Sequence, residues 1–283
     1  MSTVAELLRE GKDILVAAGI PRPRSEARHL LAHATRIDAS RLLSHPEAEV
    51  PNDGAGRYLG WVARRAGREP FAYIVGRAEF WSLDLVVGPA VLVPRADSET
   101  LIEAAIHRCA DPARPLRILD IGVGSGCLLL ALLRHFPHAR GVGTETSAAA
   151  LAVARLNAER LGLAARARLE LTSWVDDVDG PFDIVLSNPP YIPSADIADL
   201  EPEVARFEPQ AALDGGPDGL DAYRAILPAL PQLLATDAAV FLEIGTGQES
   251  QVVPMASPWF PVARIHHDLA GIARCLELAP HGC

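Results

Sequence analysis

The spacing of apolar residues changes twice along this chain and divides it into three parts. From Thr3 to Arg68 apolar residues recur at three- and four-residue intervals, beginning with Val4 and Leu7, which predicts amphipathic helices. Residues 71–93 alternate apolar with polar or small positions, a pattern typical of a β-hairpin. From residue 116 onward short apolar runs alternate with helical ones. The chain therefore combines a helical front part with an α/β body.

The α/β body is predicted to contain a parallel sheet covered by helices on both faces. Strand and helix patterns follow one another, and such alternation is typical of βαβ units. The expected helices span residues 127–135 and 148–161, and the expected strands span residues 117–121, 141–144, 167–171, 183–186, 238–244 and 262–267.

A glycine-rich turn follows the first expected strand of the body and precedes a helix. It reads Asp120-Ile121-Gly122-Val123-Gly124-Ser125-Gly126. Glycines permit tight bends and let a ligand approach the backbone. The pattern alone could serve NAD(P), FAD, S-adenosyl-L-methionine (AdoMet) or no ligand, with helix capping and close packing as the structural alternatives.

Three features favour AdoMet as the cofactor. The Gly-x-Gly-x-Gly spacing is tighter than that usual for dinucleotides. Asp120 could orient the turn or reach an ammonium group, and Glu145, at the next strand's end, could accept both ribose hydroxyls. Trp174 follows the third strand and could cover the adenine or simply pack in the core. All these positions fall at carboxyl ends of strands, where open α/β sheets bind ligands.

The run Ser187-Asn188-Pro189-Pro190-Tyr191 contains the candidate catalytic residues. It follows the apolar run 182–186, and proline cannot continue a central strand because it lacks an N–H. The amide oxygen of Asn188 and the carbonyls of Pro189 and Pro190 would form a rigid set of acceptors beside the ring of Tyr191. Such a set suits a planar –NH2 group, although the run could also be a tight turn with incidental prolines.

Composition and charge restrict the possible partners. The chain has 283 residues, 49% of them hydrophobic, and no apolar run as long as a membrane span. The net charge of −10 argues against a non-specific grip on nucleic acid. The cysteines 109, 127, 275 and 283 form no CxxC pair, and adjacent His266 and His267 would face opposite ways on a strand. We therefore expect no metal site and reduced thiols in a cytoplasmic protein.

The chain as a whole resembles the protein-(glutamine-N5) methyltransferase family of peptide-chain release factors (PrmC/HemK). The resemblance covers nearly the whole length. It rests on segments 38–43, 69–76, 79–80, 91–99, 120–126, 188–191, 242–245 and 268–271. Asn-Pro-Pro-Tyr alone is shared with DNA adenine methyltransferases, whereas the hairpin and the segment from Pro94 to Glu99 are more specific. The chain departs from the family pattern at Ser82, Ala96, Glu145 and Ser173.

The resemblance implies a fold, a cofactor and a protein substrate. The fold is a Rossmann-like class I AdoMet-dependent methyltransferase sheet, residues 94–283, joined by a hairpin linker, residues 71–93, to a helical substrate-docking domain, residues 1–70. The implied substrate is the glutamine of the Gly-Gly-Gln loop of release factors. The substrate contacts are then Asn188, Pro189, Pro190 and Tyr191, with Phe80 and Arg95 beside them. We expect a monomer that binds neither nucleic acid nor membrane.

Methyl transfer to this amide depends more on the position of the amide nitrogen than on a general base. Asn188 and the Pro189 carbonyl would accept the two N–H bonds and align the nitrogen with the methyl group, while Tyr191 would pack on the amide plane. Three other activities fit the same motifs: adenine-N6 methylation of nucleic acid, methylation of a small amide or guanidine, and non-catalytic AdoMet binding. Basic residues of the helical part could bind an acidic partner or form a solvated surface.

Overall fold

The computed structural model describes residues 2–280, and the expectation about Cys283 lies outside them. The chain folds into two compact units, residues 1–77 with 201–207 and residues 78–200 with 208–283. The first unit is named here the helical unit and the second the sheet unit.

The helical unit is built from amphipathic helices with one shared core. Its main helices are α1 (Val4–Ala17), α2 (Pro23–Thr35), α3 (Ala39–Ser44), α4 (Asn52–Ala66) and α5 (Phe71–Val75). Two short strands, β1 (Ser2–Thr3) and β2 (Glu49–Val50), pair antiparallel. Thr3 and Glu6 cap the start of α1 reciprocally, which explains why the helix begins there. Leu15, Leu30 and Tyr58 are fully buried between the helices, so the predicted helical front part is confirmed.

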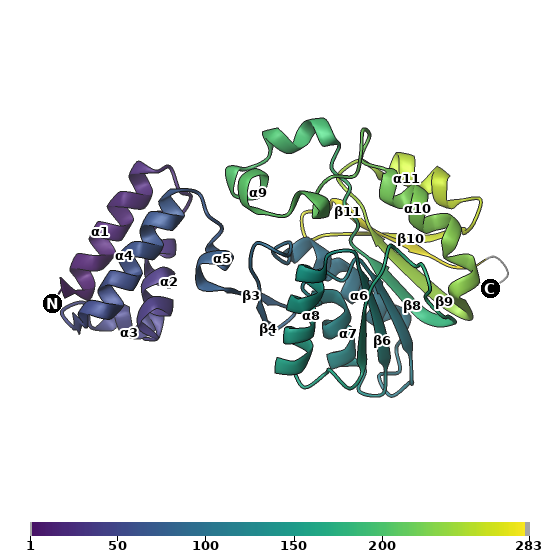
Figure 1. The fold of residues 1–283 in the computed structure, drawn as a ribbon, viewed down its shortest axis with the longest axis horizontal. Helices are drawn as coiled ribbons and strands as arrows, with labels where there is room; N and C mark the ends of the chain where they lie inside the picture. The colour runs from purple at the N-terminus through teal and green to yellow at the C-terminus, as the bar shows by residue number, and fades with distance from the viewer. Residues whose placement is uncertain (1, 281–283) are drawn as a thin grey trace. The chain divides into compact units, whose positions relative to one another are not determined.

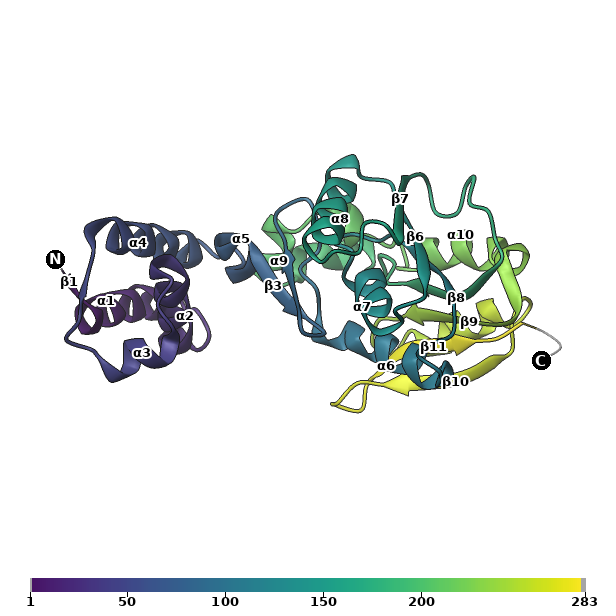
Figure 2. The ribbon, with the colours of Figure 1, turned by 90° about the horizontal axis from the view of Figure 1, so that it is seen from below.

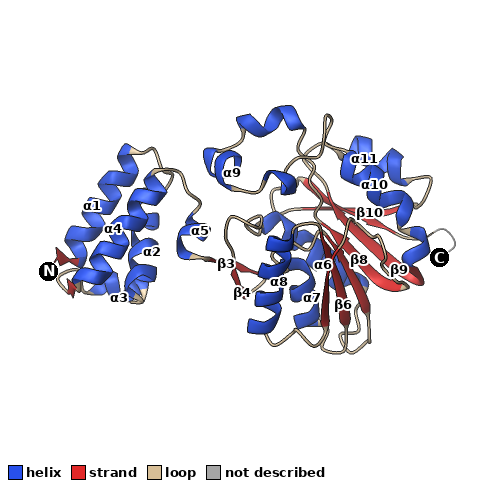
Figure 3. Ribbon diagram, in the orientation of Figure 1, coloured by secondary structure: helices blue, strands red, loops and turns tan. Residues whose placement is uncertain are grey.

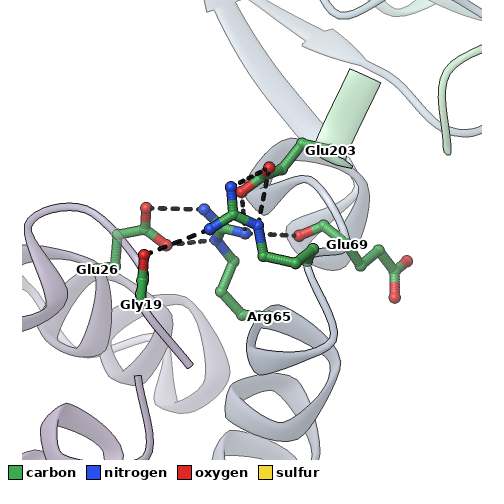
Figure 4. A network of polar contacts seen from close by, with 6 residues as sticks. Gly19, Glu26, Arg65, Glu69 and Glu203 are labelled. Carbon is green, nitrogen blue, oxygen red and sulfur yellow. Dashed lines mark hydrogen bonds and ion pairs between the residues drawn. The ribbon is translucent and has the colours of Figure 1, made fainter. Parts of the chain in front are cut away.

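A distant segment also belongs to the helical unit. Helix α9 (Pro202–Phe207) lies in the long stretch after β8 (Phe182–Ser187), yet it groups with residues 1–77. Glu203 of α9 accepts hydrogen bonds from Arg65 Nη1 at 2.9 Å and Arg68 Nε at 3.0 Å (Figure 4). Arg65 also donates from Nε to Glu26 at 2.5 Å, and its side chain is only 6% exposed. Burial opposes the charge, but these carboxylates hold the pKa of Arg65 above its usual range.

We expect Arg65→Met to destabilise the helical unit by about 2–3 kcal/mol, because it leaves the carboxylates of Glu26 and Glu203 without their shared cation. Urea unfolding measures this loss. The matched control is Arg64→Met on the same helix, whose side chain is 43% exposed and paired with Glu69, so its loss should stay below about 1 kcal/mol. Equal losses in the two variants would contradict a structural role for the Arg65 network.

The sheet unit contains seven strands in the order β10-β11-β9-β8-β5-β6-β7. The strands are β5 (Arg117–Ile121), β6 (Arg140–Glu145), β7 (Ala167–Leu171), β8 (Phe182–Ser187), β9 (Leu234–Glu243), β10 (Val262–His267) and β11 (Ala273–Leu278). The five strands from β9 to β7 run parallel to one another. Figure 2 shows β11 and β10, in yellow, continuing the sheet beyond β9.

Helices cover both faces of this sheet, as predicted. Successive residues of β5 point to opposite faces, so that Ile118 packs in one apolar core and Leu119 in the other. The first core is completed by α6 (Glu99–Arg108), α7 (Cys127–His135) and α8 (Ala148–Arg160), and the second by α10 (Asp221–Ala229) and α11 (Glu249–Ala256) (Figures 1 and 3). A Rossmann-like α/β fold is therefore confirmed.

Two details differ from the sequence-based expectations. The sheet is mixed, because β11, which was not predicted, pairs antiparallel with both β9 and β10. Residues 71–75 are helical, since Pro70 begins a helical turn and Gly76 ends it with a left-handed φ of 75°; the hairpin itself is β3 (Arg77–Phe80) and β4 (Leu83–Val86). The stretch after β8, for which no element was predicted, contains short helical turns at 194–199, 202–207 and 210–212. The domain boundaries at residues 70 and 93 stay predictions.

Candidate active site

A cavity of about 560 Å³ lies at the carboxyl ends of the parallel strands, a volume typical of small-molecule sites. Its walls come from the ends of β5, β6 and β8, from the segments that follow β5, β6, β7 and β8, and from residues 90–98. The lining residues used below are Arg95, Ser98, Gly122, Glu145, Trp174 and Asn188. The fold thus brings together residues that are as far apart in the sequence as Arg95 and Asn188.

The glycine turn exposes its backbone to this cavity. Gly122 and Gly124 have φ values of 77° and 53°, which residues other than glycine rarely adopt. A Cβ atom built on Gly122 would meet no atom within 4 Å, so the space beside it is open. The N–H groups of Gly122 and Val123 donate to the Thr144 carbonyl at 3.0 and 2.8 Å, which fixes the turn to β6. A ligand can therefore approach a rigid main-chain surface.

Glu145 ends β6 and lines the cavity next to this turn. Its carboxylate accepts the N–H groups of Gly124 at 3.0 Å, Thr146 at 2.9 Å and Ser147 at 3.0 Å. A carboxylate offers about four acceptor positions. Three of them hold the side chain in place, and the fourth receives only a long contact from Thr146 Oγ1, at 3.4 Å, which a ligand hydroxyl can replace. Trp174 also lines the cavity and contacts the second core.

Asp120 lies beneath the turn and is absent from the cavity lining. It is 1% exposed, and its Oδ2 accepts the N–H of Leu129 near the start of α7 at 3.1 Å. Its Oδ1 has no hydrogen-bond partner among the described residues. Burial raises the pKa of Asp120 to about 7, against the lowering effect of the Leu129 N–H. This geometry is suited to joining the turn to α7, and direct contact with a cofactor stays a prediction.

The raised pKa of Asp120 predicts how stability depends on pH. Between its ordinary value of 3.8 and about 7 the folded protein holds this proton more tightly than the unfolded chain. Its contribution is therefore present below pH 4 and is lost as the pH rises to about 7. We expect Asp120→Asn to gain stability relative to the parent protein by a few kcal/mol between pH 4.5 and 8, as measured by urea unfolding. The control is Asp237→Asn at an exposed position. A stability difference between Asp120→Asn and the parent that does not change with pH would contradict the assignment.

The predicted acceptor residues leave the sheet at the end of β8. Ser187 Oγ donates to the Ile121 carbonyl at 2.8 Å, which joins the ends of β8 and β5. Asn188, Pro189 and Pro190 then line the cavity. The amide Nδ2 of Asn188 donates to Ser98 Oγ at 3.0 Å. The amide oxygen of Asn188 accepts no hydrogen bond from the described residues, so it is available to a ligand.

Two residues without a role in the sequence analysis, Ser98 and Glu243, complete a buried polar network. Ser98 Oγ donates to Glu243 Oε2 at 2.5 Å, and Tyr191 donates its hydroxyl to Glu243 Oε1 at 3.3 Å. Ser98 and Glu243 are 2% and 1% exposed. Burial raises the pKa of Glu243 to about 7. Glu243 could have been noticed as the acidic residue that ends an apolar strand, but its partner lies 145 positions away.

The remaining predicted substrate contacts lie in different places. Arg95 lines the cavity and pairs through Nη2 with Glu208 Oε1 at 2.6 Å. Tyr191 is not among the lining residues, because its hydroxyl is directed to Glu243. Phe80 is 2% exposed in the first core, and Gly126 also lies outside the lining. Substrate contacts by Phe80 and Tyr191 stay predictions.

Two further findings concern metal sites and membrane spans among the described residues. Across residues 2–280, no three His, Cys, Asp or Glu side chains gather as they would around a metal ion. No described helix has the length and apolar character of a membrane span. His266 pairs instead with Glu277 on the neighbouring strand, at 2.8 Å.

Comparison with known proteins gives two family matches along the chain. Residues 6–76 match the family described as PrmC N-terminal domain, and residues 99–201 match the methyltransferase small domain. The chain is 43% identical to the release factor glutamine methyltransferase of Rhodospirillum rubrum, over 96% of this chain and 84% of that protein. It is 44% identical to that of Geobacter sulfurreducens, over 90% and 88% of the two chains.

Solved structures of low sequence identity share the fold. The catalytic domain of hMettl16 is 14% identical with a TM-score of 0.55, over 80% of this chain and 81% of that one. The Thermus thermophilus 16S rRNA methyltransferase RsmC, in complex with AdoMet and guanosine, is 18% identical with a TM-score of 0.51, over 72% and 50% of the two chains. These similarities support the methyltransferase architecture and carry no information on substrate.

Proposed function

The chain belongs to the family of release factor glutamine methyltransferases, and from this premise we propose the reaction that its cavity performs. The enzyme transfers a methyl group from AdoMet to the side-chain amide nitrogen of the glutamine in the Gly-Gly-Gln loop of peptide-chain release factors. The observation that supports this proposal is that Asn188, whose amide nitrogen is bonded to Ser98, lines the same cavity as the glycine turn and Glu145.

The residues of the cavity fit AdoMet. The Gly122 backbone is open to the cavity, and Glu145 holds a fixed carboxylate with one acceptor position for a ribose hydroxyl. Trp174 offers an apolar ring for the adenine. When bound, AdoMet supplies a methyl group on a sulfonium, a strong electrophile.

Asn188 and Pro189 provide the hydrogen-bond acceptors that can orient a carboxamide nitrogen. This nitrogen is a weak nucleophile because its lone pair is delocalised into the carbonyl. The Asn188 amide oxygen and the Pro189 carbonyl accept its two N–H bonds, which orients the lone pair and restricts the nitrogen to one position. Such placement contributes on the order of several kcal/mol. The same acceptors stabilise the positive charge that develops on nitrogen.

The proton released by the reaction needs no dedicated base. Glu145, a carboxylate of the cavity wall, is occupied by backbone N–H groups. Burial raises the pKa of the Tyr191 hydroxyl well above 10, so this group stays neutral. An N-methylated, positively charged amide is a strong acid, and water can accept its proton.

The helical unit is proposed to recognise the release factor. Its match to the PrmC N-terminal domain supports this role. A net charge of −10 supports the absence of direct nucleic-acid binding. We further propose that the enzyme is a cytoplasmic monomer, in keeping with a substrate from translation.

Incubation with labelled AdoMet and a purified release factor, followed by mass mapping, tests this function. We expect one added methyl group on the glutamine of the Gly-Gly-Gln sequence. A release factor with alanine at that glutamine should take up no label, and duplex DNA should also remain unlabelled. Label on another residue or on DNA would overturn the proposal.

A further inference from the structure

The orientation of the Asn188 amide decides whether the cavity attracts or repels a substrate –NH2 group. The oxygen and nitrogen ends of an amide have nearly the same shape, but the first accepts and the second donates hydrogen bonds. Shape alone cannot select the orientation that leaves the oxygen for the substrate. A hydrogen-bond partner of fixed polarity must do so.

Ser98 is that partner, and the direction of its own hydrogen bond is fixed by Glu243. A serine hydroxyl has one hydrogen, and the Ser98 hydrogen goes to Glu243 Oε2 at 2.5 Å. An ionised carboxylate can only accept. Ser98 Oγ is therefore left as an acceptor, and it takes the Nδ2 hydrogen of Asn188 at 3.0 Å.

The position of Glu243 is itself well defined. It ends β9, whose residue Leu242 lies beside Ser187 of β8, immediately before Asn188. Its second carboxylate oxygen accepts the Tyr191 hydroxyl, and its backbone carbonyl accepts the Tyr223 hydroxyl at 2.7 Å. Because Glu243 is only 1% exposed, water does not compete for these bonds.

We propose that Glu243 is a positioning residue that acts through Ser98 to hold the Asn188 amide with its oxygen toward the substrate, an inference that rests on the proposed methylation of an –NH2 group. Glu243 does not touch the reacting atoms. It fixes the direction of two successive hydrogen bonds, and it aligns Tyr191 from the same carboxylate.

Protonation of Glu243 would remove this control. A neutral carboxyl can donate to Ser98 Oγ, which frees the serine hydrogen to bond the Asn188 oxygen and permits the reversed amide. Burial raises the pKa of Glu243 to about 7, so this exchange falls in an accessible pH range. The charged or titratable groups that act on Glu243 or lie against it are Asp97, Cys127, Tyr191, Tyr223, Arg274 and Cys275. Among these, Arg274 favours the ionised form and Asp97 opposes it.

The test is the pH profile of kcat with release factor at saturating AdoMet, for the parent enzyme, Glu243→Gln, Ser98→Ala and the double variant. We expect the parent kcat to fall below about pH 7. Each single variant should lose about 10- to 100-fold in kcat at pH 8 and lose the acidic limb. The double variant should be no worse than the poorer single, because the two residues act as one unit.

The matched control is Glu277→Gln, a buried carboxylate on the neighbouring strand β11 that pairs with His266. It should keep both the parent kcat and the acidic limb. AdoMet affinity, measured by calorimetry, should stay within about threefold in every folded variant, since the side-chain hydrogen bonds described for Ser98, Glu243 and Glu277 do not involve Glu145 or the glycine turn. If Glu243→Gln does not fold, Ser98→Ala alone decides.

Two results would overturn the inference: an acidic limb retained in Ser98→Ala or Glu243→Gln, or additive losses in the double variant. Either would appear with a parent enzyme that methylates its release factor. Failure of the proposed function would appear instead as a parent enzyme that transfers no methyl group to that glutamine, so the two failures are distinguishable.

Discussion

Replacing Asn188 with alanine is expected to lower kcat about 10²- to 10³-fold while AdoMet affinity changes little. The reason is that the Asn188 amide oxygen acts on the carboxamide and on the charge that develops during transfer, and one such preorganised group typically contributes this much. The proposed cofactor contacts are instead the glycine turn and Glu145, and the side-chain hydrogen bond of Asn188 goes to Ser98 rather than to either of them.

The measurement pairs single-turnover kinetics with calorimetry of AdoMet binding. Asn52→Ala, an asparagine at the start of α4 in the helical unit, is the control and should leave both quantities unchanged. A parallel loss of turnover and AdoMet affinity in Asn188→Ala would show that Asn188 supports the structure of the cavity rather than the reaction.

Replacing Glu145 with alanine is expected to weaken AdoMet binding about 10- to 100-fold, the value of hydrogen bonds to a charged group. The ligand hydroxyl loses its acceptor, and so do the N–H groups of Gly124, Thr146 and Ser147. Because the second effect could disturb the turn, Glu145→Gln provides a milder variant that keeps one oxygen and should show a smaller loss.

Calorimetric Kd values for AdoMet check this expectation, with Glu170→Ala on the adjacent strand β7 as the control. At saturating AdoMet, Glu145→Ala should recover most of the parental kcat. Parental AdoMet affinity in Glu145→Ala would remove Glu145 from the binding site.

Local patterns were sufficient to predict much of the fold. The strand and helix periodicities located α7 and α8 and most of the parallel strands, because burial on one or both faces imposes those spacings. The rule that ligands bind at carboxyl ends of strands also placed Gly122, Glu145, Trp174 and Asn188 together, and all four line one cavity. These predictions depend only on residues close in sequence and on sheet topology.

Long-range contacts could not be predicted in the same way. Nothing near Glu203 indicates that α9 belongs to the helical unit, since its partners Arg65 and Arg68 are more than 130 positions away. The bond between Ser98 and Glu243 joins residues 145 positions apart. Tyr191 was expected to face the substrate, and its hydroxyl is bonded to the same carboxylate. Each outcome depends on tertiary contacts between segments that are far apart in the sequence.

The structure of this protein with S-adenosylhomocysteine and a peptide containing Gly-Gly-Gln tests the account most directly. The account predicts that the glutamine amide nitrogen lies about 3 Å from both Asn188 Oδ1 and the Pro189 carbonyl oxygen, in hydrogen-bonding geometry. A glutamine bound with its oxygen toward Asn188, or bound outside this cavity, would contradict it.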